Sequence, residues 1–511
     1  MGKFYITTAI DYVNSRPHVG TAYEKIAADA IARYRRLAGD DTFFAMGTDE
    51  HSLNVQREAE RRGLAPKAYC DEMAVVFEQT WRSLGISHDT FIRTTEPRHE
   101  AAVREIFARI HAKGDIYPGL YKGLYCASCE AFYQEKDLVE GKCPHHGIAL
   151  QTIEEKNYFF RLTKYRDALL AHVRDVNPEF VRPEIRRNEI LNVLEGGLED
   201  ISVSRASASW GIPLPIDPTQ VVYVWFDALI NYVAAVGFPA EPERFAKWWP
   251  ADLHVIGKDI TRFHCIIWPA MLLAADLPLP KSVFGHGFIS VNGQKLSKSL
   301  GNVIEPEAIV SRFGADALRY FLLREIVWGG DGDFSWEQLE RRYNADLAND
   351  LGNLLSRTTS MVERYLGGEV ADPGGARDAF QQPLLREVAG GESIHFNDYW
   401  GRLDLARGLA AIWELVRRAN RVIEEQAPWN LAKDQAKREE LQQLLYDLLE
   451  SLRITALLVA PAMPSKAQEI WARVGQPGEV AGARHLADLA WRVGARFTGI
   501  KAGPPLFPKQ A

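Results

Sequence analysis

The N-terminal hydrophobic pattern alternates between short apolar runs and helical periodicity. Residues 4–10 form a largely apolar run that predicts a buried strand. A turn-rich stretch follows over residues 11–17, and apolar positions then recur near helical spacing from Ala22 to Tyr34. A second strand is expected over residues 42–46. Strand, helix and strand in succession predict a parallel, doubly wound sheet, in which ligands bind at the carboxyl ends of the strands.

This pattern is interrupted between residues 114 and 213, where a cysteine cluster, aromatic residues and scattered glycine and proline occur. Strand-like runs resume at residues 221–226 and 253–256, and we expect them to complete the N-terminal sheet. The sequence therefore predicts an α/β fold with a Rossmann-type parallel sheet and an insertion. The expected divisions are residues 1–113 and 214–285 for the sheet domain, residues 114–213 for the insertion and residues 286–340 for a following region.

Strand patterns disappear from about residue 341 onward. Between Leu405 and Ile423, apolar residues recur every three or four positions and form one apolar face of a helix. Residues 344–366 and 437–459 show a similar pattern. Amphipathic helices in succession bury their apolar faces against one another, so we expect an all-α helical bundle over residues 341–511.

Composition limits the possible classes of protein. A chain of 511 residues is too long for one core, and its 47% hydrophobic and 25% charged residues are typical of a soluble globular enzyme. The formal net charge of −7 argues against indiscriminate nucleic-acid binding, but it permits local basic patches that bind RNA. The start of the sequence lacks the apolar core of a signal peptide, and apolar runs elsewhere are too short to span a bilayer. We therefore expect a cytoplasmic protein that is not bound to a membrane.

Three of the five cysteines lie between Cys126 and Cys143, which favours metal binding over a disulfide framework. The spacing Cys126-x-x-Cys129 followed by Cys143-x-x-His146 suits tetrahedral zinc, and His145 is an alternative fourth ligand. Four protein ligands leave no open coordination position on the metal. We therefore expect one structural Zn²⁺ per chain, in a zinc knuckle that holds the shape of the insertion.

Two short motifs with chemistry suited to phosphate lie far apart in the chain. Residues 18–21 (HVGT) come between the first expected strand and its helix, where glycine permits close approach and a helix N-terminus favours phosphate. Residues 295–299 (KLSKS) place two lysines in a small-residue loop that could close over a polyphosphate. Alone, the first motif is usually only a turn, and the second is usually only a solvated basic loop.

In this order, the two motifs resemble the HIGH and KMSKS signatures of class I aminoacyl-tRNA synthetases. Thr21 replaces the second histidine of HIGH, and Leu296 replaces the methionine of KMSKS. A threonine hydroxyl can donate a hydrogen bond but cannot carry charge, so the role of this position toward ATP stays open. Further segments resemble the methionyl-tRNA synthetase family, namely residues 47–51, 224–228, 256–260, 263–264, 268–270 and 426–429.

The resemblance implies a two-step reaction and the residues that perform it. L-Methionine and ATP, with Mg²⁺, would form methionyl-adenylate and pyrophosphate, and the methionyl group would then pass to the terminal adenosine of initiator or elongator tRNA(Met). His18, Lys295 and Lys298 would be the catalytic residues, which stabilise charge on the phosphates. The other residues implied in ATP binding are Gly20, Thr21, Gly257, Asp259, His286, Gly287 and Ser297.

A methionine pocket needs an anion for the ammonium group and aromatic walls for the thioether. By the same resemblance, Asp49 would bind the ammonium group. Trp225, Ala228 and Tyr232 have the spacing i, i+3 and i+7, so a helix would place them on one face. The residues implied for the side-chain pocket are Ile10, Tyr12, Trp225, Ala228, Tyr232, Ile260, His264 and Trp268.

Single-stranded RNA loops are recognised by stacking on aromatic rings and by hydrogen bonds to base edges. The resemblance assigns these roles, for the anticodon, to Asn353, Arg357 and Trp429 in the helical bundle. Without the resemblance, the first two would be interpreted as a helix-surface pair and Trp429 as a core residue beyond a helix end.

There are two alternative functions, of which one differs in the amino-acid substrate and the other in the class of protein. Another class I synthetase is possible in principle, but zinc in the cysteine enzyme needs an open position for the substrate thiol, and the leucine, isoleucine and valine enzymes carry an editing insertion larger than the roughly 100 residues here. A zinc-containing RNA-binding protein that has lost catalysis is the second alternative, and Thr21 is its only support. We expect a monomer, because the sequence ends soon after the bundle.

Overall fold

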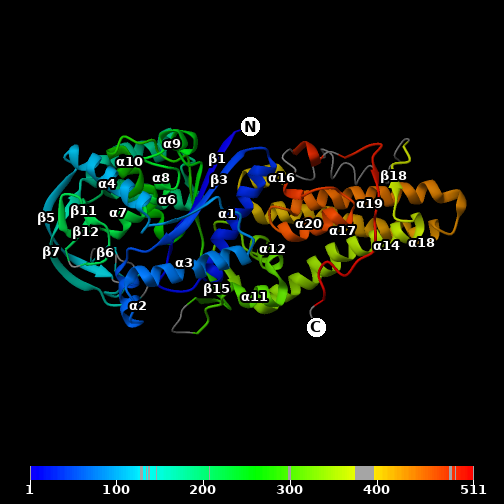
Figure 1. Cartoon of the computed structure of the whole chain (residues 1–511), viewed down its shortest axis with the longest axis horizontal. Coiled ribbons are helices and arrows are strands. Elements are labelled where there is room, and N and C mark those ends of the chain that lie inside the picture. Colours follow the sequence, from blue (N-terminus) through cyan, green and yellow to red (C-terminus); the bar gives the residue numbers. More distant parts are fainter. Residues whose placement is uncertain are drawn as a thin grey trace.

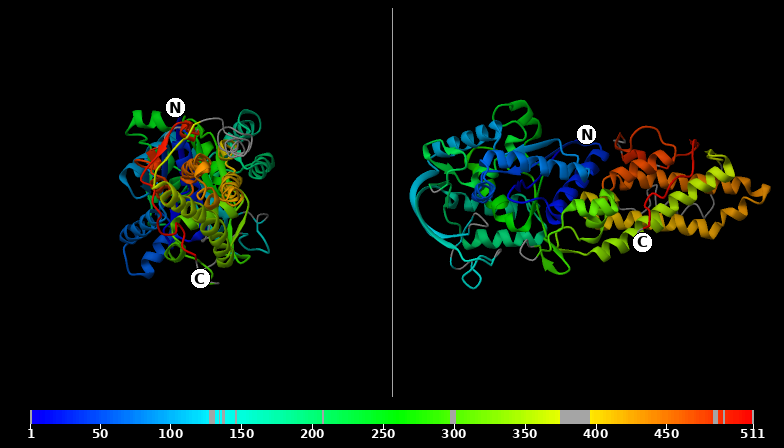
Figure 2. Two further views of the ribbon diagram at one scale, coloured as in Figure 1. Left: turned by 90° about the vertical axis from the view of Figure 1, so that its right-hand side faces the viewer. Right: turned by 60° about the horizontal axis from the view of Figure 1, so that its bottom comes forward.

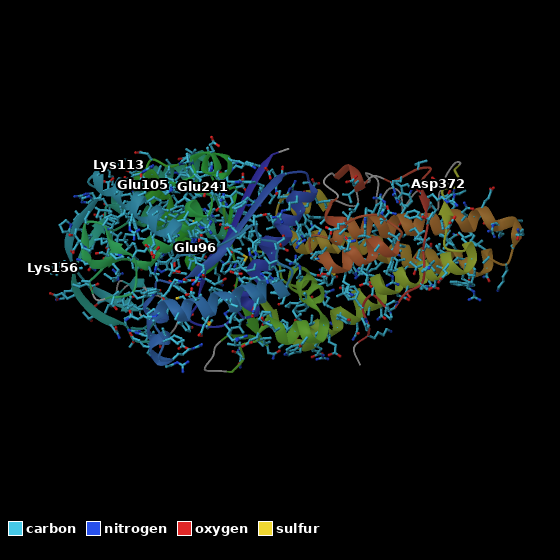
Figure 3. The ribbon with its side chains drawn as sticks, in the orientation of Figure 1. Glu96, Glu105, Lys113, Lys156, Glu241 and Asp372 are labelled. Carbon is cyan, nitrogen blue, oxygen red and sulfur yellow. The ribbon has the colours of Figure 1, made fainter. Side chains whose placement is uncertain are left out.

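The molecule is elongated, with a sheet-containing half at one end and long helices at the other (Figure 1). Segments coloured blue to green form the first half, and the yellow and orange helices form the second. Charged side chains such as Lys113 and Lys156 are exposed at the periphery (Figure 3). The computed structural model describes residues 2–126, 131–133, 135, 138–144, 147–206, 208–296, 301–374, 396–482, 486–489 and 491–509.

A parallel sheet forms the centre of the first half. Strand β1 (Lys3–Thr8) lies between β3 (Asp41–Asp49) and β13 (Leu253–Gly257). The outer strands are β2 (Asp11–Tyr12), β4 (Thr90–Arg93), β14 (Val283–His286) and β8 (Val181–Arg182). The order is β2-β3-β1-β13-β14-β8, with β4 also paired to β3, and every pairing is parallel. The predicted doubly wound sheet is confirmed.

Helices cover both faces of this sheet, because successive side chains of a strand point to opposite sides. Along β1, Ile6 belongs to one hydrophobic core and Tyr5 to the other. The helix predicted after the first strand is confirmed as α1. Helices that contribute to the first core include α1 (Val19–Leu37), α2 (Leu53–Arg61) and α3 (Pro66–Ser83), and those that contribute to the second include α4 (Pro97–Ala112), α8 (Asn231–Ala234), α9 (Pro242–Trp248) and α10 (Trp268–Ala274).

The insertion contains an antiparallel sheet of its own, with the order β6-β5-β7-β9. Residues 181–182, however, form β8 at the edge of the parallel sheet, paired with β14. The predicted insertion over residues 114–213 thus includes a short strand of the parallel sheet, which the sequence did not indicate because a two-residue edge strand has no recognisable periodicity. The elements here are β5 (Ile116–Cys126), β6 (Ala131–Tyr133), β7 (Gln151–Phe160), β9 (Ile201–Ser202), η2 (Leu162–Tyr165), α5 (Arg166–Ala171), η3 (His172–Val176) and α6 (Glu184–Gly196).

The strand expected over residues 221–226 was also predicted wrongly. Only its first two residues are in a strand, which belongs to a separate antiparallel sheet, and the chain turns at Tyr223 into a helix. All six side chains are buried, and a fully buried apolar run has the same composition in a strand as in a helix. The elements are β10 (Ser204–Arg205), β11 (Pro213–Leu214), β12 (Asp217–Val222) and α7 (Val224–Ala228).

A small sheet and three helices connect the two halves of the molecule. The sheet has the order β16-β15-β17, which brings residues 289–291 beside residues 332–334. Its strands are β15 (Ile289–Val291), β16 (Gln294–Lys295) and β17 (Gly332–Phe334), and the helices are α11 (Pro306–Phe313), α12 (Ala315–Glu325) and α13 (Trp336–Arg342). Two short helices, η4 (Lys258–Ile260) and η5 (Phe263–Ile267), follow β13.

The predicted helical bundle is confirmed. Its longest helices are α17 (Leu405–Gln426) and α19 (Arg438–Val459), and the segment expected to be helical over residues 344–366 forms η6 (Tyr343–Gly352) and α14 (Asn353–Leu366) without a break. One short pair of strands, β18 (Val370–Ala371) and β19 (Arg496–Phe497), is an exception to the expected absence of strands. The remaining helices are α16 (Phe396–Gly401), α18 (Pro428–Leu431), η7 (Gln435–Lys437), α20 (Pro464–Arg473), η8 (Val480–Gly482) and η9 (Leu486–Leu489).

The C-terminal segment, coloured red, returns from the bundle toward the middle of the molecule (Figure 2). There the ring of Phe507 packs edge-on against Tyr343, with 5.8 Å between the ring centroids. Among the helices that the structure describes, none is long and apolar enough to cross a membrane.

A buried ion pair links helix α1 to the bundle. Arg319 on α12 and Asp29 on α1 are fully buried, with 2.7 Å between Nη2 and Oδ2. The same guanidinium donates to the carbonyl oxygens of Ala462, Pro461 and Leu84 at 2.8, 2.9 and 3.2 Å. Burial alone would raise the pKa of Asp29, but the charges of its arginine partners outweigh burial and hold that pKa below its usual range.

We expect Arg319→Met to destabilise the protein by about 3 kcal/mol, because three buried carbonyl oxygens lose their donor and Asp29 loses one of its cations. The loss is measured as a lower midpoint of thermal unfolding. The matched control is Arg312→Met on α11, whose half-exposed ion pair with Glu340 contributes about 0–1 kcal/mol. Equal losses in the two variants would contradict the importance of the buried pair.

Candidate active site

The two motifs predicted to bind phosphate meet at the N-terminus of α1. Leu296, within the second motif, lies so close to Gly20 that a Cβ added there would be 3.3 Å from the leucine Cδ1. The chain that follows the second motif is hydrogen-bonded to the first motif, since the Val19 amide donates to the Ile304 carbonyl at 2.9 Å. Residues that are remote in the sequence are therefore neighbours at one end of one helix.

His18 and Thr21 together form the start of α1. The His18 Nδ1 accepts hydrogen bonds from the amides of Gly20 and Thr21 at 3.1 and 3.3 Å. The Thr21 hydroxyl accepts from the His18 amide at 3.0 Å and donates to the His18 carbonyl at 2.9 Å. This reciprocal capping box satisfies backbone groups that the helix leaves without partners. Because Nδ1 is an acceptor, the neutral ring carries its proton on Nε2, which can donate to a ligand.

Other residues expected to bind ATP lie where the parallel strands end. Strand β13 ends at Gly257 and β14 at His286. A Cβ at Gly257 would lie 2.6 Å from a carboxylate oxygen of Asp259, and one at Gly287 would lie 2.1 Å from the Gly330 carbonyl. Only glycine fits at position 287, because the neighbouring atoms there belong to the backbone, whereas at position 257 the Asp259 carboxylate can turn away.

His286 is buried between two partners rather than open to a ligand. Its Nε2 lies 2.9 Å from a carboxylate oxygen of Glu24 on α1, and its Nδ1 lies 2.8 Å from the Gly287 carbonyl. The side chain thus holds β14 against α1. Of the second motif, Ser297 and Lys298 lie outside the described residues, and Lys295 is described only in its backbone, within β16.

A small hollow at the same edge of the sheet brings together eight of the nine residues predicted to bind methionine. Trp268 is the exception, because it is fully buried behind the hollow, with its ring centroid 6.0 Å from that of Tyr232. The lining residues that were predicted are Ile10, Tyr12, Asp49, Trp225, Ala228, Tyr232, Ile260 and His264. Ala9, Leu229 and Asn231 also line the hollow and were missed, although each is next to a predicted residue in the sequence.

Hydrogen bonds fix the protonation of His264 in the wall of this hollow. Its Nδ1 lies 3.0 Å from the Ile260 carbonyl, which can only accept, so Nδ1 carries the proton. Its Nε2, 2.7 Å from the Tyr232 hydroxyl, is then the acceptor. Burial lowers the pKa of His264 to about 4, so the ring is neutral at pH 7. A neutral wall suits an uncharged ligand side chain.

The hollow combines a carboxylate with aromatic rings. Asp49 ends β3 and is 3% exposed. Trp225 stacks on Phe263, with 3.9 Å between ring centroids, and meets Tyr12 edge-on at 6.2 Å. The hollow encloses about 20 Å³, which holds roughly one water molecule. A larger ligand therefore requires the lining side chains to move.

The insertion places two of the four expected zinc ligands in buried positions. Cys126 ends β5, and Cys143 begins a turn in which its carbonyl accepts from Gly147 at 2.8 Å and its amide donates to Ile148 at 2.9 Å. The cysteines are 0% and 1% exposed. Cys129, His146 and the alternative ligand His145 lie outside the described residues. Within the described part of the chain, no group of three or more His, Cys, Asp or Glu side chains is placed to hold a metal.

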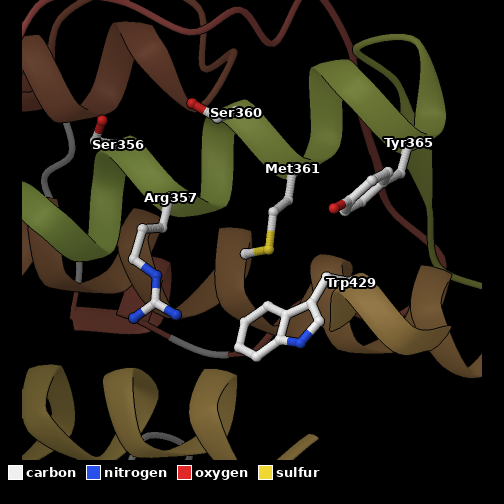
Figure 4. A pocket seen from close by; sticks show the side chains of 6 residues that line it. All are labelled: Ser356, Arg357, Ser360, Met361, Tyr365 and Trp429. Carbon is white, nitrogen blue, oxygen red and sulfur yellow. The ribbon is translucent and has the colours of Figure 1, made fainter. Parts of the chain in front are cut away.

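A larger hollow of about 350 Å³ lies in the helical bundle between α14 and α18 (Figure 4). Arg357 and Trp429, two of the predicted anticodon-binding residues, both line it, and Figure 4 shows them pointing toward one another. The third, Asn353, is exposed at the first position of α14, one turn before Arg357. The remaining lining residues are Ser356, Ser360, Met361 and Tyr365.

An aromatic ring and a cationic side chain border this hollow near the protein surface. Trp429 is 38% exposed, and it follows Ala427, whose φ of 44° ends α17 in a left-handed conformation and redirects the chain. Arg357 forms an ion pair of 2.6 Å with Glu424 on α17, and the glutamate is 64% exposed. Because the glutamate is solvent-exposed, this ion pair contributes little to stability.

Comparison with known proteins identifies the family. Residues 4–153 and 146–359 match the family described as "tRNA synthetases class I (M)". The methionine–tRNA ligase of Caldanaerobacter subterraneus subsp. tengcongensis is 46% identical over 507 residues, which cover 99% of this chain and 78% of the relative. The methionine–tRNA ligase of Thermotoga maritima is 47% identical over 511 residues, which cover 99% of this chain and 80% of the relative.

Solved structures agree with this assignment. The structure of Mycobacterium tuberculosis methionyl-tRNA synthetase in complex with methionyl-adenylate matches with a TM-score of 0.95 and 42% identity, covering 99% of this chain and 100% of that one. Its apo form matches with a TM-score of 0.88 and 40% identity, covering 100% of this chain and 99% of that one. On its sequence and its fold together, the chain belongs to the methionine–tRNA ligase family of class I tRNA synthetases.

Proposed function

We propose that this protein is a methionine–tRNA ligase, which forms methionyl-adenylate from L-methionine and ATP and transfers the methionyl group to the terminal adenosine of tRNA(Met). The observation that supports this most is the contact of Leu296 with Gly20, beside a hollow that contains Asp49 and Trp225. A nucleotide at the N-terminus of α1 and an amino acid in the hollow would be neighbours at one edge of the sheet. Attack of one on the other requires this proximity.

Activation requires the methionine carboxylate to attack the α-phosphorus of ATP and expel pyrophosphate, while negative charge spreads over the phosphoryl oxygens. The Nε2–H of His18 would donate to one of these oxygens, since its Nδ1 is held by the amides of α1. The positive end of the α1 dipole would favour the same charge. Lys295 and Lys298 would approach the leaving pyrophosphate when their loop closes. Mg²⁺ on the phosphates would neutralise further charge.

The methionine would bind through its two ends. The Asp49 carboxylate would hold the ammonium group, while Trp225 and neutral His264 would contact the thioether. Contacts between sulfur and an aromatic ring contribute about 0.3–1.5 kcal/mol each. Because such contacts distinguish size better than chemistry, homocysteine is the analogue most able to enter.

The hollow in the bundle would select the tRNA. A base of the single-stranded anticodon would stack on the exposed face of Trp429, and Arg357 would leave Glu424 to donate to a base edge. Asn353, one helical turn away, would add a further hydrogen bond. Both initiator and elongator tRNA(Met) are proposed substrates, and we still expect a monomeric, cytoplasmic protein.

We infer further that Cys126, Cys129, Cys143 and His146 hold one Zn²⁺. The buried thiols at a strand end and in a tight turn fit this metal, whose knuckles use such turns. Four protein ligands would leave the metal no free position. Its contribution would then be the stability of the insertion, with no part in the chemistry.

Exchange of pyrophosphate into ATP, measured with each amino acid separately, tests the proposed substrate. L-Methionine should support exchange, homocysteine should do so with lower kcat/KM, and cysteine, leucine, isoleucine and valine should not. Exchange with cysteine in place of methionine would support another class I enzyme. No exchange with any amino acid would support an RNA-binding protein without catalysis.

The Trp429→Ala variant should lose charging of tRNA(Met) by about 5- to 150-fold in kcat/KM, because one stacked base contributes about 1–3 kcal/mol. Methionine-dependent exchange should be unchanged, since the hollow in the bundle is separate from the nucleotide site. Trp429→Phe keeps an aromatic face and serves as the control, with most of its charging activity retained. Equal losses of charging and exchange would rule out the anticodon role.

Metal analysis of the purified protein by plasma mass spectrometry should give one zinc per chain. Cys143→Ser should lose this zinc and unfold at a lower temperature, because the metal stabilises the insertion. Cys265→Ser is the matched control, since Cys265 is equally buried but lies outside the insertion. Zinc retained in full by Cys143→Ser, or absent from the folded wild type, would refute the site.

A further inference from the structure

Asp227 is a fully buried carboxylate held between two histidines. It lies on α7, two residues after Trp225 and directly before Ala228, both of which line the small hollow. Its Oδ2 lies 2.8 Å from the Nδ1 of His51, and its Oδ1 lies 2.5 Å from the Nε2 of His99. The side chains of Asp227 and His99 are 0% exposed, and that of His51 is 5% exposed.

Both histidines donate to this carboxylate. Burial would raise the pKa of Asp227, but the charges and hydrogen bonds of the two imidazoles outweigh burial and lower that pKa to about 2, so the group is ionised at neutral pH. In the part of the chain that the structure describes, the Nδ1 of His99 is buried without a hydrogen-bond partner. The Nε2 of His99 is thus the ring nitrogen that bonds to the carboxylate.

The three residues connect the two sides of the methionine pocket. His51 comes two residues after Asp49, the group proposed to bind the ammonium ion at the end of β3. His99 lies on α4. Asp227 is on the helix that carries Trp225, the aromatic wall. The carboxylate thus joins the polar end of the pocket to its apolar side.

The end of β3 is itself held firmly. Glu50 accepts from the Arg93 guanidinium at 2.6 and 3.0 Å and from the Thr48 hydroxyl at 2.8 Å. The Glu50 amide donates to the Thr94 hydroxyl at 2.9 Å, and the Glu50 carbonyl accepts from the Trp210 indole at 2.7 Å. Because this strand end is held so firmly, the hydrogen bond between Asp227 and His51 sets where α7 lies relative to it, and the bond to His99 ties α7 to α4.

An ion is a poor means of stabilising a core, since an apolar side chain of similar size would fill the same space without the cost of desolvation. A buried carboxylate with two oriented donors does what an apolar residue cannot, which is to fix distance and direction. We propose that Asp227 is a positioning residue for amino-acid binding, which acts through His51 and His99 to set the spacing between the Asp49 carboxylate and the Trp225 ring. This inference rests on the proposed methionine-binding function of the hollow.

The Asp227→Asn variant tests the proposal because it keeps the volume of the side chain. Its amide oxygen can accept from one histidine, but its NH2 group meets the N–H of the other. We expect the KM for methionine in pyrophosphate exchange to rise about 10- to 100-fold, as misplacement of a positioning group does, with the KM for ATP unchanged. Glu243→Gln on α9, an exposed acid, is the control and should match the wild type.

A second pair of variants keeps the test decisive if Asp227→Asn does not fold. His99→Gln retains an N–H donor near the position of Nε2, whereas His99→Met has a similar length and no donor. The methionine KM should rise only in His99→Met. An unchanged methionine KM in folded Asp227→Asn, equal changes in the KM values for methionine and ATP, or equal effects of the two His99 variants would overturn the proposal. Absence of exchange in the wild type would instead overturn the proposed function.

Discussion

Helix α1 buries three charged side chains, and much of the structure is arranged to compensate them. Glu24, Lys25 and Asp29 are each less than 9% exposed. A buried ion without a partner is costly, so each needs an opposite charge or hydrogen bonds from a neighbouring element. The partners come from Asp11 and the Ala9 carbonyl after β1, from His286 on β14 and from Arg319 on α12. The groups that compensate the buried charges of α1 thus connect the sheet, the connecting region and the bundle.

The position of the active site follows from the same constraint. With its middle fixed by these charges, α1 presents its N-terminus, capped by His18 and Thr21, to the edge where the parallel strands end. The charge of Asp11 is not fully compensated, because burial raises the pKa of this carboxyl group to about 6 although the charge of Lys25 lowers it. Asp11 is next to Tyr12, which lines the small hollow proposed to bind methionine, so this hollow and α1 share one electrostatic network.

The two hollows differ as their proposed ligands differ. The proposed methionine pocket is small and enclosed by rings and a neutral histidine, which suits a single apolar side chain. The hollow in the bundle is larger, and its aromatic face is open, which suits a base of a single-stranded loop. Between them, Arg319 and Tyr320 are consecutive on α12: the first bonds to Asp29, and the second donates to Asp346 on η6 at 2.9 Å. Helix η6 continues into α14, which carries Arg357.

The sequence by itself determined those features that depend on neighbours along the chain. These are the first strand and helix, the long helices of the bundle and, with the family resemblance, two motifs that meet in space and most of the residues that line the small hollow. Periodicity, spacing and glycine at a turn are local signals, so they can be recognised from the sequence without coordinates.

Tertiary structure alone decided what depends on residues distant in the sequence. Residues 221–226 are uniformly apolar because they are buried, and only their neighbours in space show that the chain turns into α7. Strand β8 is defined by its pairing with β14, and Trp268 is buried against Tyr232, outside the lining of the small hollow. The link of Asp227 to His51 and His99 has no sequence pattern, since three separate elements contribute one residue each. A hydrogen bond depends on distance and direction in space, and the linear order of residues records neither.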